Sequence, residues 1–246
     1  MKNPIANNRS SALTLGAIAF ALTFIGAALR VINLYLNFDI SVGYYSSSAL
    51  VDIMNIFFVL SVFALGALSF VMVKKLALET AEPEKDPTGK VIVCFLPIAA
   101  LAYILAKSYF DVYFAMNSPN KILLHMACLA GMFFFVTLAR AALGALKGRS
   151  YLFYLTTTVF LSGVYAIPSA IFCMISKIYR NYTYFYFDLF ILAVFVFAAV
   201  KLIALMTATK PEVEDAPTEA NFETETATET ETETETETEP EATTEE

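Results

Sequence analysis

The chain has no tryptophan, a single histidine, His125, and only three cysteines. Because protein zinc sites draw their three or four ligands mainly from Cys and His, one histidine argues against a bound metal. The cysteines, Cys94, Cys128 and Cys173, all fall inside apolar runs, and an odd number of buried thiols argues against a disulfide framework. We therefore expect no metal and no cofactor, and we interpret the cysteines as small packing residues.

Enzyme signatures are also missing from the sequence. It contains no His-Glu-x-x-His, no Gly-x-Ser-x-Gly, no phosphate-binding P-loop and no Gly-x-Gly-x-x-Gly pattern. Asp52 and Asp188 are a conceivable carboxylate pair. However, the cations Arg30 and Lys107 are expected at the same depth and favour two ionised carboxylates, whereas a shared-proton dyad needs the opposite surroundings. We expect that the protein is not an enzyme, and we expect no nucleic-acid partner.

Charge is scarce in most of the chain, and long apolar runs take its place. The 246 residues are 58% hydrophobic with a mean hydropathy of +0.63, whereas soluble domains are about 45–50% apolar. Six runs of about 20 or more residues are long enough to cross a hydrocarbon core about 30 Å thick. The sequence predicts an all-α, polytopic membrane protein whose six transmembrane helices form three hairpins. The expected spans are about 12–36, 49–73, 91–110, 122–143, 151–175 and 186–206.

The first apolar run also has features of a signal peptide. Lys2 and Arg9 precede it, and Gly26-Ala27-Ala28 resembles a small-residue cleavage site. The stretch from residue 11 to residue 29 is nevertheless longer than a usual hydrophobic region of about 7–15 residues. Apolar residues also resume after Arg30. We therefore interpret this run as a retained first helix.

The two ends of the chain differ sharply in charge. All 16 Lys and Arg precede Pro211, whereas 15 of the 23 Asp and Glu follow it. The Thr-Glu alternation between Glu223 and Glu239 has no apolar surface to bury. We expect a cytoplasmic N-terminus over 1–11, a transmembrane domain over 12–206 and a disordered, Thr/Glu-rich cytoplasmic tail over 207–246. The tail is either a solvated repeat expansion or an acidic arm for a basic partner.

Basic residues predict the topology of the spans. Eleven of the 16 Lys and Arg lie before the first span, in alternate connections or at the end of the last span. Since cytoplasmic loops carry an excess of Lys and Arg, both termini are predicted to be cytoplasmic. We expect the plasma membrane, with a bacterial inner membrane favoured, and the lipid bilayer as the main partner. The sequence does not indicate protein partners.

Polar residues inside the spans define a candidate site. A charged side chain at the centre of a span costs about 2.5–3.5 kcal/mol on insertion scales, so these residues are candidates for function. Several of them are expected at a common depth, in the outer third of the membrane. They predict an outward-facing polar site for a small anionic or zwitterionic ligand. The candidate ligand-binding residues are Arg30, Asn33, Asp52, Asn55, Lys107, His125 and Asp188.

Two explanations of these residues stay open. Arg30 and Asp52 are expected to be neighbours on adjacent helices, and an inward-facing cluster around them favours a small transporter or ligand-binding transport subunit. Alternatively, Arg30 and Lys107 extend to the headgroups and the carboxylates only pair with them. A filled interior with the charges at the lipid rim favours a non-transporting scaffold or assembly partner that uses the acidic tail. His125 is either a packing residue or a proton-sensitive group.

Overall fold

The computed structural model describes residues 4–39, 44–45, 48–72, 87–111, 119–144, 148–177, 179 and 185–207. The prediction of six long apolar helices is confirmed, because six helices of this part of the chain are long and apolar enough to cross a membrane. They are compatible with a multi-pass membrane protein. In chain order the elements are α1 (Pro4–Asn37), β1 (Phe38–Asp39), β2 (Tyr44–Tyr45), α2 (Ala49–Met72), α3 (Pro87–Phe110), α4 (Pro119–Ala142), α5 (Gly148–Ile175) and α7 (Phe185–Thr207).

The structure shows two features that the apolar runs do not predict: prolines at three helix starts and a short strand pair after α1. The helices α1, α3 and α4 each begin at a proline, Pro4, Pro87 and Pro119. Proline suits the first helical position, where its missing N–H would have no helical partner. The short strands β1 and β2 pair antiparallel directly after α1, with Phe38 opposite Tyr45. The predicted tail after residue 207 lies outside the described residues.

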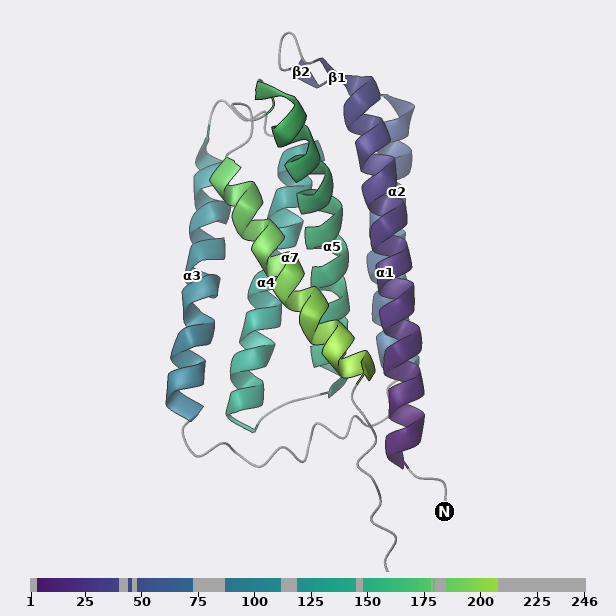
Figure 1. Cartoon of the computed structure of the whole chain (residues 1–246), viewed down its shortest axis with the longest axis vertical. Coiled ribbons are helices and arrows are strands. Elements are labelled where there is room, and N and C mark those ends of the chain that lie inside the picture. Colours follow the sequence, from purple (N-terminus) through teal and green to yellow (C-terminus); the bar gives the residue numbers. More distant parts are fainter. Residues whose placement is uncertain are drawn as a thin grey trace, which may run out of the picture. The chain divides into compact units, whose positions relative to one another are not determined.

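Helix α5 is the centre of the bundle. It packs against α4, α7, α1 and α2, while α1 also packs against α2 and α3 packs against α4. Figure 1 shows α1 and α2 side by side on one flank, α3 on the other, and α7 crossing α4 and α5 obliquely. Among the six spans α5 is the most buried and α3 the least. The connections between α3 and α4 and between α5 and α7 lie largely outside the described residues, so the three-hairpin arrangement stays a prediction.

Close helix contacts in this bundle depend on small residues. A Cβ added to Gly163 of α5 would lie 2.5 Å from the Cγ2 of Thr23 on α1 and 2.8 Å from the ring of Phe195 on α7. The absent side chain therefore lets α5 approach both neighbours. One polar bond also crosses the bundle, because the hydroxyl of Thr158 on α5 donates to the carbonyl oxygen of Ala130 on α4 at 2.9 Å.

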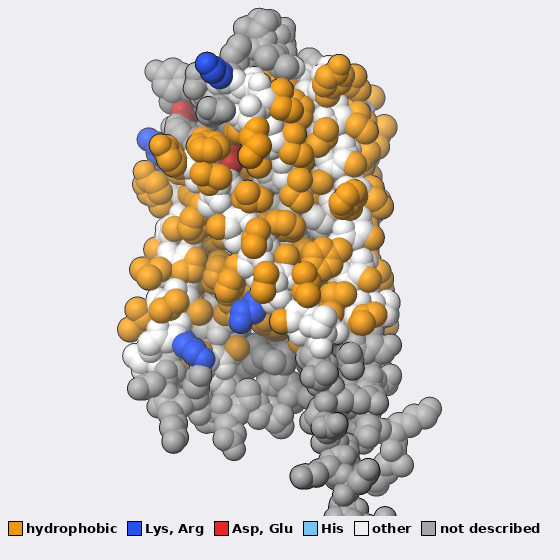
Figure 2. Space-filling view, viewed as in Figure 1, with side chains coloured by type: hydrophobic (Ala, Val, Ile, Leu, Met, Phe, Trp, Pro, Cys, Tyr) orange, Lys and Arg blue, Asp and Glu red, His pale blue; other side chains and the backbone are white. Residues whose placement is uncertain are grey.

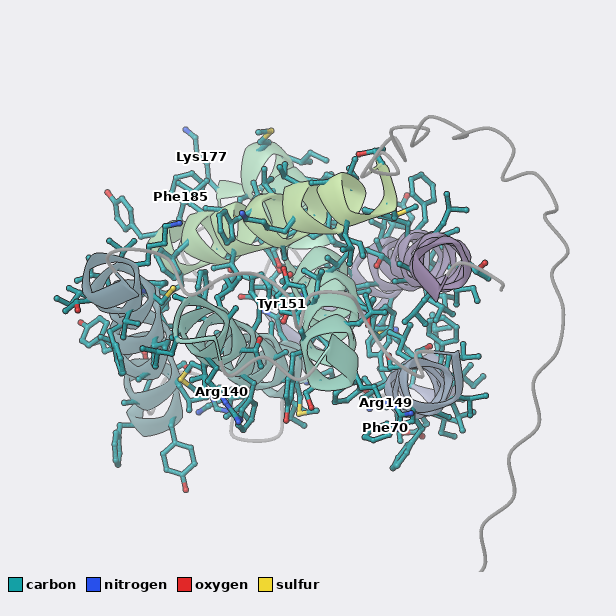
Figure 3. All side chains as sticks on the ribbon, turned by 90° about the horizontal axis from the view of Figure 1, so that it is seen from below. Phe70, Arg140, Arg149, Tyr151, Lys177 and Phe185 are labelled. Carbon is teal, nitrogen blue, oxygen red and sulfur yellow. The ribbon has the colours of Figure 1, made fainter. Side chains whose placement is uncertain are left out.

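The helix surfaces facing away from the core are apolar. Large side chains such as Phe24, Phe63, Leu96 and Met174 are mostly exposed. On the face in Figure 2, charged side chains lie toward the two ends of the helices and apolar side chains fill the band between them. Seen along the bundle in Figure 3, Tyr151 lies near the centre while Arg140 lies at the periphery. Such a surface suits lipid rather than water.

Candidate functional site

Arg30 is the centre of a buried polar cluster near the end of the bundle where α1 finishes. It lies seven residues before Asn37, about 10 Å along the helix axis from the end of α1. Only 3% of Arg30 is exposed. Its Nη2 donates to the Oδ1 of Asn120, in the first turn of α4, and to the Oγ of Ser169 on α5 at 3.3 Å. Two helices, α4 and α5, thus place polar groups around the guanidinium that α1 supplies.

A second part of the cluster lies on α5 and α7. The phenol of Tyr165 on α5 donates a hydrogen bond of 2.5 Å to the Oδ1 of Asp188 on α7. The thiol of Cys173 lies 3.6 Å from the other carboxylate oxygen. The Cζ of Arg30 stands 4.9 Å from the centre of the Tyr165 ring, in cation–π geometry. Tyr165 therefore connects the cation and the carboxylate, one through its ring and the other through its hydroxyl.

A small apolar cluster covers the polar one at the end of the bundle. It consists of Leu34, Phe38, Phe172, Cys173 and Tyr179. Tyr179 belongs to both clusters, since its ring meets Phe38 edge-on at 5.2 Å and its hydroxyl lies 3.3 Å from the Oγ of Ser169. Burial raises the pKa of Tyr179 above its ordinary value, although the nearby Arg30 opposes this, so the phenol keeps its proton at neutral pH. The site is closed in this conformation.

The structure separates the predicted site residues of α2 from Arg30. Buried positions of α2 are Val51, Met54, Phe58, Ser61 and Leu65, whereas Asp52 and Asn55 are exposed. Among the described residues, no hydrogen bond or ion pair joins Arg30 to Asp52, so the expected pair is not formed. The reason is the helix face, because the apolar stripe of α2 turns inward and leaves the adjacent positions outside.

Asn33 lies one turn after Arg30 on α1 and is fully buried. Its Nδ2 points to the Sδ of Met54 at 3.3 Å, and its Oδ1 accepts from the side chain of Asn37. Asn33 thus faces α2, while Arg30 faces α4 and α5. Among the described residues, no hydrogen bond joins it to the guanidinium, and its contact with Met54 links α1 to α2.

Lys107 and His125 lie apart from the Arg30 cluster. Lys107 of α3 is exposed. His125 of α4 is half-buried, and its Nε2 lies 2.8 Å from the Oγ of Ser108 on α3. The neighbouring Lys121, which is almost fully buried, donates to the backbone carbonyl of Tyr109 at 3.3 Å. That carbonyl is in the last turn of α3, where the helix dipole and the unpaired carbonyl groups favour a nearby cation. The contacts of Lys121 and His125 therefore join α4 to α3.

Of the predicted site residues, Arg30, Asn33 and Asp188 are buried inside the bundle, but several residues that contact them were not predicted as part of the site. Asn120 precedes the apolar run that begins at residue 122, so hydropathy gives no signal for it, although Pro119 marks a helix start. Tyr165 and Ser169 lie four residues apart on one face of α5, and that spacing is the available sequence signal. No signal in the sequence distinguishes Tyr179 from the other tyrosines near it.

Two buried donors in the cluster have no acceptor. The Nε of Arg30 and the Nδ2 of Asn120 are both buried and lack a hydrogen-bond partner among the described residues. The amide orientation follows from the guanidinium, which only donates, so Oδ1 must face it and Nδ2 must point away. A buried donor left unpaired costs about 1–3 kcal/mol, and more if it is charged. A small acceptor such as a carboxylate that reached the Nε of Arg30 would satisfy this charged donor.

Comparisons of this chain with protein-family models, with curated proteins and with solved structures return no match. Its function must therefore be argued from the cluster itself. Within the described residues, His, Cys, Asp and Glu side chains do not gather in groups of three or more. The distinctive chemistry of the cluster is a buried guanidinium with spare donors and a carboxylate close by.

Proposed function

We propose that the protein binds a small ligand with an anionic group beside Arg30 and acts as a small transporter or ligand-binding transport subunit. One observation carries the proposal: among the described residues, the Nε of this buried arginine inside a candidate membrane span and the Nδ2 of its partner Asn120 both lack a hydrogen-bond acceptor. Ionisable residues at such depth are costly and are retained mainly for function. A planar guanidinium also matches a carboxylate or another oxyanion in geometry.

The closed apolar cluster above Arg30 is consistent with this role. Binding and release require that the polar cluster become accessible, and Phe38 and Tyr179 stand between it and the end of the bundle. We propose that this conformation is occluded, and that displacement of these two rings opens the site outward. The plasma membrane, cytoplasmic termini and an outward-facing site belong to the same proposal.

Ligand-dependent stability tests the binding step. Purified protein in detergent would be screened by thermal unfolding against small carboxylates, amino acids, chloride and inorganic phosphate. A ligand at 100 times its Kd stabilises a folded protein by about 2.7 kcal/mol, which raises the midpoint by several degrees. Arg30→Gln should abolish the shift, whereas Lys107→Gln, a change at an exposed cation of α3, should retain it.

Uptake into liposomes then separates transport from binding alone. A ligand identified by the thermal screen should accumulate in vesicles that contain the protein and not in vesicles that contain Arg30→Gln. Absence of any stabilising anion in the screen would remove the proposal. Stabilisation without uptake would leave a ligand-binding transport subunit.

A second function is favoured by the residues of α2 and α3. Asp52, Asn55 and Lys107 are exposed on the sides of candidate membrane spans, where they are available to headgroups or to another membrane protein. A non-transporting scaffold or assembly partner, with the acidic tail as its interaction element, would use these three exposed polar residues to contact another membrane protein. Replacement of all three by Leu should then abolish co-purification of a partner and leave ligand-induced stabilisation unchanged.

A further inference from the structure

Asp188 is placed so that its protonation state responds to the binding of an anion beside Arg30. Its exposed fraction is 2%, and its two oxygens meet the hydroxyl of Tyr165 and the thiol of Cys173. Arg30 lies against the face of the same Tyr165 ring. The single phenol between them is too thin to screen one charge from the other, because both lie in a region of low dielectric constant.

Among the described residues, Arg30 is the basic residue whose contacts lead to Asp188. From α5, Tyr165 and Cys173 face Asp188, from the segment after α5 Tyr179 interacts with it, and from α1 Arg30 lies behind Tyr165. On α4, the amine of Lys121 donates to the backbone carbonyl of Tyr109 on α3, and the ring of His125 lies within hydrogen-bond distance of Ser108. Within the described part of the cluster, the positive charge of Arg30 therefore faces the negative charge of Asp188 across Tyr165.

An anion that binds beside Arg30 removes this balance. The buried cluster would then hold two negative groups and one positive group, and an uncompensated buried charge is strongly unfavourable. Neutrality returns if one proton from the aqueous phase adds to the carboxylate. The Oδ1 of Asp188 continues to accept from Tyr165, so the proton adds to Oδ2, where the sulfur of Cys173 is its neighbour. No other bond forms or breaks.

We propose that binding of a carboxylate beside Arg30 is coupled to the uptake of one proton by Asp188, with Tyr165 transmitting the coupling. This inference rests on the proposed function, and it names the coupling ion of the same site. In a transporter it would make the substrate and a proton move together. At lower pH the protonated site binds the anion more tightly, and at higher pH the coupling weakens binding.

Proton-linked binding of acetate tests the coupling in the full-length protein. Acetate is the smallest common carboxylate with a methyl group and serves as the probe. For wild type in nanodiscs, the affinity for acetate should rise as the pH falls, by up to about tenfold per pH unit where binding takes up one full proton. Calorimetry in buffers of different ionisation enthalpy should give uptake of about one proton per acetate.

Three variants test whether Asp188 is the residue that takes up the proton. Asp188→Asn should bind acetate with an affinity independent of pH and with no proton uptake. Asp52→Asn, which changes an exposed carboxylate of α2, should behave as wild type. Tyr165→Phe keeps the aromatic ring against Arg30 but removes the donor to Asp188, so the free protein should already hold the proton and take up fewer than one.

An infrared difference spectrum of wild type gives a readout that does not depend on the folding of Asp188→Asn. Binding of isotopically labelled acetate should produce the band of a protonated carboxylic acid from the protein. Acetate binding without proton uptake or this band would overturn the coupling and leave the proposed site intact. Uptake that persists in folded Asp188→Asn would also overturn it. No acetate binding at any pH in wild type would overturn the coupling of carboxylate binding to proton uptake, and the absence of any stabilising anion in the thermal screen would overturn both proposals.

Discussion

At the scale of single residues, side chains of the same charge at similar expected depth differ in burial in this protein. Arg30 is buried among polar groups, whereas Lys107 is exposed. Asp188 is buried, whereas Asp52 is exposed. A buried charge is tolerated only where hydrogen bonds and an opposite charge replace water, and Tyr165 supplies the link for both buried ions. Depth alone therefore does not identify a site residue.

Double-mutant cycles should show that Arg30 is coupled to Asp188 and not to Asp52. For Arg30→Leu with Asp188→Leu, we expect a coupling energy of about 1–3 kcal/mol, because removal of one charge leaves the other buried and unbalanced. For Arg30→Leu with Asp52→Leu, the coupling should stay below about 0.5 kcal/mol, since their side chains share no bond. The measurement is the free energy of unfolding in detergent for singles and doubles. A larger coupling with Asp52 would contradict the structure.

Neighbouring threonines on α5 should respond oppositely to the same substitution. Thr158→Val removes the hydroxyl that donates to Ala130 on α4, and inter-helix bonds of this kind contribute about 0.6 kcal/mol on average and up to about 1.7. The hydroxyl of Thr157 is buried without a partner among the described residues, so Thr157→Val should be neutral or stabilising. Thermal unfolding of both variants checks this pair, and equal losses would contradict it.

At the scale of elements, the helix faces determine which residues meet. Helix α5 is buried around most of its circumference, so its polar residues have no outer surface available and must pair inside the bundle. It continues through Pro168, which lacks the N–H that would bond the carbonyl of Val164. Helix α3, by contrast, packs against α4, and its other faces are exposed. The candidate site lies on α5 because that helix has neighbours on several sides.

Enlargement of Gly163 should separate α5 from its neighbours. A Cβ at this position would approach Thr23 and Phe195 more closely than side chains normally allow, so Gly163→Ala should destabilise the protein by about 1–3 kcal/mol. Gly89→Ala is the matched control, since a Cβ there meets nothing within 4 Å. It should be neutral or slightly stabilising, because alanine favours the helix. The measurement is the thermal midpoint in detergent, and equal effects of the two changes would refute the close contact.

At the scale of the whole molecule, charge and apolar surface indicate how the bundle is oriented in a membrane. The described helices have an apolar band between their ends, as Figure 2 shows for one face. The basic residues Arg140 and Arg149 lie where α4 ends and α5 begins, at the end of the bundle seen first in Figure 3. From the bias of Lys and Arg, we predict that this end faces the cytoplasm. The polar cluster is at the opposite end.

Reporter fusions should show both termini in the cytoplasm. A reporter that is active only in the cytoplasm should be active when fused after Glu246 and silent when inserted after Ser47. The expectation follows from the eleven of 16 Lys and Arg assigned to one side of the membrane. The opposite pattern would reverse the topology, and the Arg30 cluster would then open to the cytoplasm.

The sequence by itself determined that six helices are long and apolar enough to span a bilayer, because about 20 apolar residues match its thickness whatever the helices contact. It also placed Arg30 and Asp188 among seven candidate residues, without separating them from Asp52 or Lys107. Only the tertiary structure decided that Arg30 meets Asn120, Ser169 and Tyr165 rather than Asp52. The physical reason is that hydropathy reports depth, whereas the rotation of each helix about its axis depends on packing among residues distant in sequence.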